Sequence, residues 1–178
     1  MPYPLTHLET NRLTFRALSI DDFDAWMPLF ALDKVAIFLD MDQNLTQREC
    51  CQQWFDKSFH RLKNNQGVMN AIIDKQTGKL IGQCGLLIQT IQNTQRLEIG
   101  YSILPAFWGR GYACEAAIKC RDYAFSNNLA DSLISAVHQD NIASEKVAIK
   151  NGMTLEKKVG SFHIFSITKE RWKTAKSS

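Results

Sequence analysis

Two glycines separated by a single residue, Gly109 and Gly111, stand where a strand pattern changes to a helix pattern. Glycine lets the backbone turn sharply and approach a ligand closely, and the first N–H groups of a helix have no partner within that helix. Such N–H groups bind phosphate oxygens well. The turn therefore predicts an anion site, although glycines also occur in turns that only reverse the chain.

The other common phosphate motifs do not fit this turn. A dinucleotide fingerprint needs a third small residue at position 114, where this chain has Cys114, and it belongs early in a βαβ unit. A P-loop needs Gly-Lys-Ser/Thr, which is absent from the chain. The anion site would therefore belong to another class.

Glu98 is the candidate general base. A carboxylate beside a bound substrate can accept a proton from a reacting group. Strand alternation places Glu98 on one face with the small residues Gly100 and Ser102, and this predicts space above the carboxylate. The opposite face would carry Leu97, Ile99, Tyr101 and Ile103. A salt-bridged or edge-exposed glutamate would give the same pattern.

The first part of the chain reads as one strand and two helices. Alternating apolar residues predict a strand over 12–18. Capping boxes at Ser19–Asp22 and Thr46–Glu49 predict the starts of two helices, and Pro28 should bend or shorten the first. Gly67 should end the second helix.

The rest of the chain alternates between strands and helices. We expect strands near 68–73, 80–89, 95–104, 132–138, 153–159 and 162–168, a helix from the glycine turn to about 127, and another from Asn141 to Asn151. The predicted fold class is α/β (α+β), with a single mixed, mostly antiparallel, twisted sheet of about seven strands and about four helices. No linker interrupts the chain, so residues 1–178 should form one domain.

Composition excludes several classes of function. A net charge of +3 does not favour nucleic acid, and the cationic tail at 169–176 fits a solvated helix end or a frayed terminus. No run approaches the ~20 apolar residues that span a bilayer, and the start lacks the features of a signal peptide, so we expect no membrane partner and a cytoplasmic location. The five cysteines and four histidines show no metal-ligand spacing, and we expect no metal.

Three stretches together resemble the GNAT acetyltransferases. They are Glu-Ile-Gly-Tyr-Ser-Ile-Leu-Pro at 98–105, Trp-Gly-Arg-Gly-Tyr-Ala-Cys-Glu-Ala at 108–116, and Asn-Ile-Ala-Ser at 141–144 followed by Lys-Asn-Gly-Met at 150–153. The similarity is greatest to the branch of the ribosomal-protein N-terminal acetyltransferases and extends from Glu9 nearly to the C-terminus. The resemblance implies a GNAT-like sheet whose two central parallel strands splay apart.

The same resemblance implies acetyl-CoA as the co-substrate. The family motif is commonly Gln/Arg-x-x-Gly-x-Gly/Ala, and this chain has Trp in the first place. Main-chain N–H groups of the turn would hold the pyrophosphate, and its residues are Trp108, Gly109, Arg110, Gly111, Tyr112 and Ala113. Ile103 and Leu104 would pair with the pantetheine arm. Asn141 would bond the pantetheine amide, which is compatible with a helix N-cap role.

The group that protonates the leaving thiolate stays open. Many family members have a tyrosine where this chain has Ala148, and Ser144 matches a serine typical of the N-terminal acetyltransferase branch. Ser144 would also fit a hydroxyl that bonds its own backbone. Tyr101 and Tyr112 are weaker candidates because such aromatic side chains usually pack. An acyl-enzyme on Cys114 is disfavoured, since no histidine lies nearby in sequence.

The sequence therefore predicts an N-acetyltransferase in which a primary amine, on a protein N-terminus or a small molecule, attacks acetyl-CoA directly in a ternary complex. The segment 21–65 and the strands after Gly160 should select the acceptor, and the chain should be a monomer or a homodimer. The acidic residues Asp21, Asp22, Asp24, Asp40 and Asp42 could attract a cationic acceptor, but an ordinary solvated face explains them better. The alternative is a catalytically weak acyl-CoA-binding module that acts as a sensor or interaction domain.

Overall fold

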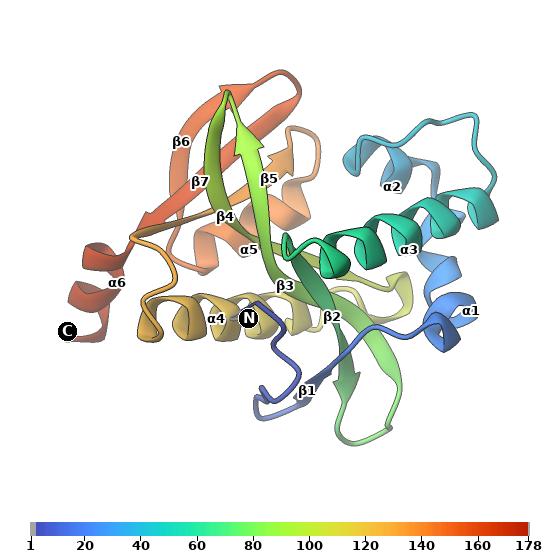
Figure 1. The fold of residues 1–178 in the computed structure, drawn as a ribbon, viewed down its shortest axis with the longest axis horizontal. Helices are drawn as coiled ribbons and strands as arrows, with labels where there is room; N and C mark the ends of the chain where they lie inside the picture. Colours follow the sequence, from blue (N-terminus) through green and yellow to red (C-terminus); the bar gives the residue numbers. More distant parts are fainter. Residues whose placement is uncertain (1–2, 178) are drawn as a thin grey trace.

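The structure, a computed structural model, describes residues 3–177. Seven strands form one sheet in the order β1-β2-β3-β4-β5-β7-β6 (Figure 1). They are β1 (Leu13–Arg16), β2 (Gly67–Asp74), β3 (Leu80–Ile91), β4 (Thr94–Ile103), β5 (Ser132–His138), β6 (Thr154–Val159) and β7 (Phe162–Thr168). Only β4 and β5 pair in parallel. The mixed, mostly antiparallel sheet predicted from the sequence is confirmed.

Six α-helices form within residues 3–177, which is more than the four or so predicted. They are α1 (Phe23–Trp26), α2 (Asp33–Phe38), α3 (Gln47–Lys63), α4 (Tyr112–Ser126), α5 (Ile142–Lys150) and α6 (Lys169–Lys176). There are also short 3-10 helices, namely η1 (Ile20–Asp22), η2 (Met27–Ala31) and η3 (Pro105–Phe107). The two α-helices missing from the sequence prediction are α2 and α6.

Local signals account for the first helices. Both predicted capping boxes form, with Ser19 paired to Asp22 and Thr46 paired to Glu49. The helix after Ser19 is short: α1 stops at Trp26 and continues as a 3-10 turn that contains Pro28. This shortening agrees with the loss of a backbone donor at proline.

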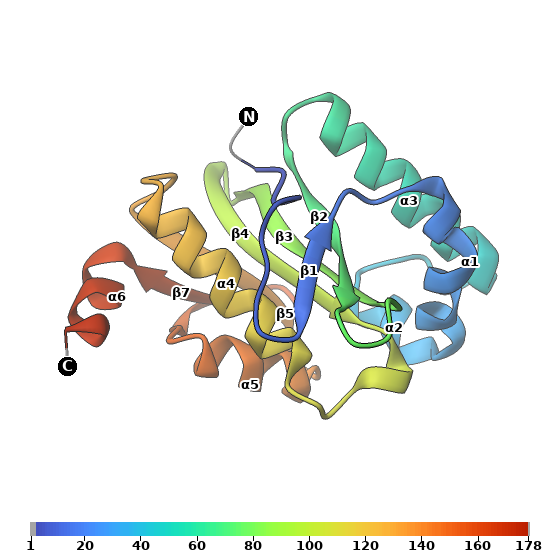
Figure 2. The ribbon, with the colours of Figure 1, turned by 90° about the horizontal axis from the view of Figure 1, so that it is seen from below.

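The helices lie on both faces of the sheet (Figure 2). One core forms where α4 and α5 pack on the sheet, and it buries residues such as Phe125 and Ile99. A second core forms beneath α1, α2 and α3 on the other face, around Trp26 and Phe55. Because both faces are covered, most residues of the middle strands are buried.

The two edges of the sheet are short or irregular. β1 has four residues, and the chain before it folds back to form a bridge between Glu9 and Thr14. β6 is largely exposed, and its register with β7 shifts between Leu155 and Lys157. None of the helices in the described part of the chain is long and apolar enough to cross a bilayer.

Candidate active site

The glycine turn takes the shape that its sequence predicts. Gly109 and Gly111 have φ angles of 74° and 78°, in the left-handed region that favours glycine. Gly111 is the N-cap of α4 and brings no side-chain acceptor to the first turn of this 15-residue helix. The leading N–H groups of α4 are therefore left for an external acceptor, and their partial positive charge favours a phosphate oxygen.

The parallel strands β4 and β5 separate almost as soon as they pair. Their register contains two partner pairs, Leu97 with Leu133 and Glu98 with Ile134. Beyond that point side chains replace the backbone ladder: Ser135 Oγ donates to the carbonyl of Ile99 at 2.8 Å, and the N–H of Ala136 donates to Glu98 Oε1 at 3.0 Å. A gap between the two strands thus opens beside Glu98.

Tyr101 and Ile103 direct their peptide groups into this gap. In an antiparallel pair alternate residues direct both backbone groups to the same side. The carbonyl of Ile99 faces β5, where it accepts from Ser135, so the residues two and four positions later face the same way. Backbone groups at a strand edge can hydrogen-bond an extended amide-containing chain.

The structure corrects the pairing role predicted for Leu104. Its N–H donates to Ile81 O at 2.9 Å, and its carbonyl accepts from the N–H of Phe107 at 2.9 Å, so both groups are already bonded. The carbonyl of Ile103 accepts from Trp108 Nε1 at 2.6 Å. The Trp108 indole, which is 43% exposed, therefore folds back from the turn onto the end of β4.

Glu98 is buried, with 7% of its surface exposed. Gln89 Nε2 donates to its Oε2 at 2.6 Å, while the amide oxygen of Gln89 accepts from Arg61 Nη2 at 3.0 Å. Burial raises the pKa of Glu98 above its ordinary value, against the opposing hydrogen bonds from Ala136 and Gln89. Each oxygen has a second lone-pair direction for a further donor.

The open space predicted beside Glu98 is not present at Gly100. A methyl group at Gly100 would lie 2.9 Å from Leu87 Cδ1 and 3.2 Å from the sulfur of Met69. These two side chains come from the adjacent strands β3 and β2 and fill the space that the small residue leaves. Strand alternation alone could not reveal them, because they are distant in sequence.

Asn141 and Ser144 meet at the start of α5. Asn141 Oδ1 accepts from the N–H of Ser144 at 3.2 Å, which confirms the predicted N-cap. The carbonyl of Ser144 accepts from the hydroxyl of Tyr101 at 2.7 Å. Burial raises the pKa of Tyr101, so its proton stays on the phenol. The hydroxyl of Tyr101 thus ties β4 to the first turn of α5.

The remaining predicted residues line the turn. The Arg110 guanidinium lies over the Phe107 ring, 5.6 Å from its centroid, and Tyr112 and Ala113 pack against the core beneath α4. Burial raises the pKa of the Cys114 thiol, so the thiolate is disfavoured. Within residues 3–177 no group of His, Cys, Asp and Glu side chains is arranged to hold a metal ion.

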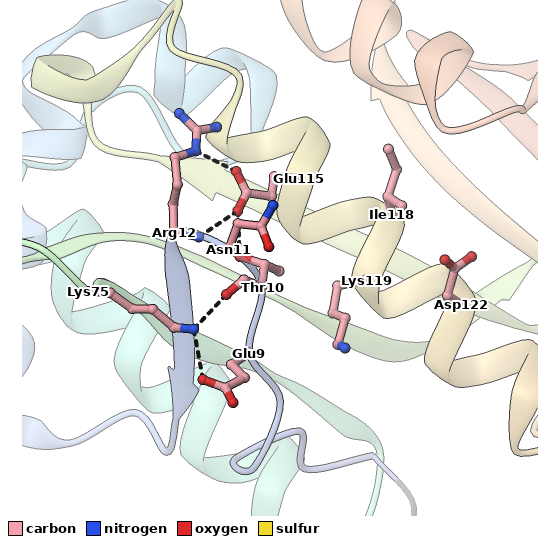
Figure 3. A pocket seen from close by; sticks show the side chains of 9 residues that line it. All are labelled: Glu9, Thr10, Asn11, Arg12, Lys75, Glu115, Ile118, Lys119 and Asp122. Carbon is pink, nitrogen blue, oxygen red and sulfur yellow. Dashed lines mark hydrogen bonds and ion pairs between the residues drawn. The ribbon is translucent and has the colours of Figure 1, made fainter.

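Sequence reasoning missed the polar contacts that hold the turn and the carboxylate. Gln89 supports Glu98, and Arg12 bonds both Glu115 and the carbonyl of Arg110. Arg12 and Glu115 lie 103 positions apart, so no local pattern could join them. They border a surface hollow of about 930 Å³ between the segment before β1 and α4 (Figure 3), which the gap residues Glu98 and Tyr101 do not line.

A family model described as an acetyltransferase (GNAT) domain matches residues 12–154. The uncharacterized protein YkkB of Bacillus subtilis (strain 168) is 34% identical over 160 residues, which cover 86% of this chain and 88% of YkkB. An acetyltransferase from Agrobacterium tumefaciens str. C58 is 26% identical, with a TM-score of 0.74 over 90% of this chain and 92% of that chain.

The ribosomal L7/L12 alpha-N-protein acetyltransferase RimL, solved in complex with coenzyme A, has the same fold. Its TM-score is 0.70 over 91% of this chain and 97% of that chain, at 18% identity. The family match covers the glycine turn, the gap between β4 and β5, and Asn141. On this match and on the similarity to YkkB, the chain belongs to the GNAT acetyltransferase family and is an enzyme of the acyltransferase class.

Proposed function

We propose that this enzyme transfers an acetyl group from acetyl-CoA to the nitrogen of a primary amine, with both substrates bound at once. The observation that carries the proposal is the gap that opens between β4 and β5 beside Glu98 and leads to the uncapped start of α4. The gap suits an extended thioester arm, the helix start suits a pyrophosphate, and a buried carboxylate stands where the two strands part.

The residues present fit the donor. The N–H groups from Gly109 to Ala113 would hold the pyrophosphate, since the N–H of Trp108 already donates to Pro105 O. The peptide groups of Tyr101 and the N–H of Ile103 would pair with the pantetheine amides. Asn141 lies at the N-terminus of α5 and accepts a hydrogen bond from the N–H of Ser144, whose carbonyl accepts one from Tyr101. RimL, which has this fold, was solved with coenzyme A.

Glu98 is the proposed general base. The amine nitrogen attacks the thioester carbonyl carbon, the C–N bond forms, and Glu98 accepts the proton that the nitrogen loses. The raised pKa of Glu98 suits this task, since a base works best when its pKa approaches the working pH. Gln89, fixed by Arg61, keeps the carboxylate in one orientation.

The C–S bond then breaks, and the departing thiolate takes a proton. Ser144 is proposed to donate a hydrogen bond to the thiolate, because its hydroxyl belongs to the first turn of α5 beside Asn141. The proton itself comes from solvent, to which Glu98 later releases the proton taken from the amine. Tyr101 is the weaker donor, since its phenol proton is directed at the Ser144 carbonyl. The raised pKa of Cys114 argues against an acyl-cysteine and in favour of direct attack.

Two acceptor classes remain in this proposal, a protein N-terminus and a small amine. Helices α1, α2 and α3 and the strand β7, which follows Gly160, would select between them, since segments beside a rigid sheet usually carry specificity. RimL acts on a ribosomal protein, but at 18% identity it shows a common fold and not a common acceptor.

Calorimetric titration with acetyl-CoA, with NADH and ATP as controls, tests the donor half. We expect acetyl-CoA to bind and the two controls not to bind. Thiol release is then measured with peptides that begin with alanine or serine and with a polyamine. Release with one class and an acetylated product would establish the reaction. Selective binding without release for any acceptor would favour an acyl-CoA-binding module, and no binding would overturn the proposal.

A further inference from the structure

The segment just before β1 is fastened across the first turn of α4 (Figure 3). Glu115 accepts three hydrogen bonds from it: one from the hydroxyl of Thr10, one from the N–H of Arg12 at 3.0 Å, and one from Arg12 Nε at 2.6 Å. The guanidinium of Arg12 also lies over the Tyr112 ring, 4.3 Å from its centroid. This cluster is separate from Glu98 and the gap.

Arg12 reaches beyond Glu115 to the glycine turn itself. Its Nη1 donates to the carbonyl of Arg110 at 2.9 Å. Arg110 lies between Gly109 and Gly111, two residues with little intrinsic restriction on their backbone angles. A charged hydrogen bond at this carbonyl therefore restrains the part of the turn that the sequence leaves free.

The orientation of one peptide plane follows from this bond. In a trans peptide the C=O and the next N–H point in opposite directions. Fixing the Arg110 carbonyl toward Arg12 consequently directs the N–H of Gly111 away from Arg12. That N–H precedes the uncapped N–H groups of α4, so it can join them in binding one anion.

Glu115 anchors Thr10 and Arg12 to the first turn of α4. A free carboxylate in the first turn of α4 would repel a phosphate, but here it is engaged by Thr10 and Arg12. Burial opposes its ionisation, yet the hydrogen bonds from Thr10 and Arg12 hold the pKa of Glu115 below its usual value. The ionised carboxylate and Arg12 neutralise each other beside the turn.

We propose that Arg12 and Glu115 are positioning residues for the donor: they preset the turn 108–113 for the pyrophosphate of acetyl-CoA without contacting the reacting atoms. The inference rests on the proposed function and adds to it two residues outside the predicted site. A preset turn loses less conformational freedom when the anion binds, so the pair acts on donor affinity and not on the chemical step.

The test compares two donors in Arg12→Lys and Glu115→Gln. Acetyl-CoA carries the pyrophosphate, whereas S-acetylpantetheine lacks it and presents the same thioester. Lysine keeps the charge of Arg12 but cannot bond Glu115 and the Arg110 carbonyl together. We expect the KM for acetyl-CoA to rise roughly tenfold in both variants, with kcat nearly unchanged, as expected for loss of one or two charged hydrogen bonds in ground-state binding. The KM for S-acetylpantetheine should not change.

Lys75→Gln is the matched control. Lys75 bonds Glu9 and the carbonyl of Thr10 in the same segment but does not reach the turn. It should leave both KM values as they are, and thermal unfolding should show all three variants folded. Calorimetry with CoA and with pantetheine repeats the comparison without turnover, so it still decides the inference if a variant is inactive.

Equal losses for the two donors, or an unchanged KM for acetyl-CoA in both variants, would overturn the inference while the proposed function stands. A similar rise in Lys75→Gln would also overturn it, because the effect would then come from the segment as a whole. If the unaltered protein binds no CoA, the proposed function fails first and this inference fails with it.

Discussion

At the scale of single residues, Glu98 shows how burial and hydrogen bonding compete. Removal from water disfavours its charge, while the N–H of Ala136 and the amide of Gln89 favour it, and burial has the larger effect. A group whose pKa is higher in the folded than in the unfolded state stabilises the fold at low pH and loses that contribution as pH rises through the folded value. The ionised base is thus held at some cost in stability.

We expect kcat/KM to rise with pH through the raised pKa of Glu98, because only the carboxylate accepts the proton of the amine. Glu98→Gln should lower turnover by about 10²-fold or more and remove this acid limb, while acetyl-CoA still binds. A pH–rate profile measures both effects. Unchanged turnover in Glu98→Gln would remove Glu98 from the mechanism.

Gln89→Ala provides a second measurement on the same group. Loss of a hydrogen bond that favours the charged form raises the pKa further, so the acid limb should move toward alkaline pH. A limb that stays in place would mean that the profile reports another group.

The site was only partly predictable at this scale. The positive φ angles of the glycine turn and the N-cap at Asn141 could be predicted because residue types and spacing are local signals. The spatial neighbours could not be predicted. Leu87 and Met69 fill the space beside Gly100, and Ile81 and Phe107 form hydrogen bonds with the backbone groups of Leu104. These contacts depend on strand register and on a 3-10 turn, which residue spacing does not specify.

At the scale of elements, the turn and α4 act as one unit. Gly111→Ala should cost about 1–2 kcal/mol of stability, because an L-residue is strained at a φ of 78°. It should also raise the KM for acetyl-CoA, since the strain is relieved by moving the N–H groups at the start of α4. Urea denaturation and donor titration measure the two effects.

Gly78→Ala is the matched control for this strain. Gly78 has a φ of 69° in the turn between β2 and β3, and a methyl group there would contact nothing within 4 Å. We expect a similar loss of stability with the KM for acetyl-CoA unchanged. If Gly111→Ala and Gly78→Ala have the same KM for acetyl-CoA, the conformation of the glycine turn does not affect donor binding.

Elements with strong local signals were predicted, and those without them were not. Strand alternation and the two capping boxes gave the sheet and the starts of η1 and α3. α2 begins after Leu32, which offers no side-chain cap, and six residues are too few to show a helical period. α6 is held by Trp172, whose Nε1 donates to Asp122 at 2.7 Å, 50 positions away.

At the scale of the whole molecule, the sheet is weakly joined along its middle. Two partner pairs connect β4 to β5, and the hydroxyl of Ser135, which is 2% exposed, adds a bond to Ile99. Ser135→Ala should therefore lower the free energy of unfolding by about 1–3 kcal/mol, since the Ile99 carbonyl would be left buried without that partner.

Urea denaturation checks this expectation, with Ser132→Ala as the control. Ser132 begins the same strand and is only partly buried. Its replacement should change stability by less than about 0.5 kcal/mol, as at most surface positions. Equal losses in both variants would mean that Ser135 contributes no specific link across the gap.

The two edges of the sheet also have a consequence for behaviour in concentrated solution. A long, flat, apolar edge strand recruits strands from other molecules and begins aggregation. Here one edge has only four residues and is partly covered by the folded-back chain, and the other is bent by its register shift and carries Glu156, Lys157 and Lys158. Neither outer edge strand therefore offers a template for intermolecular β-pairing, and we expect no aggregation through the sheet edges in concentrated solution.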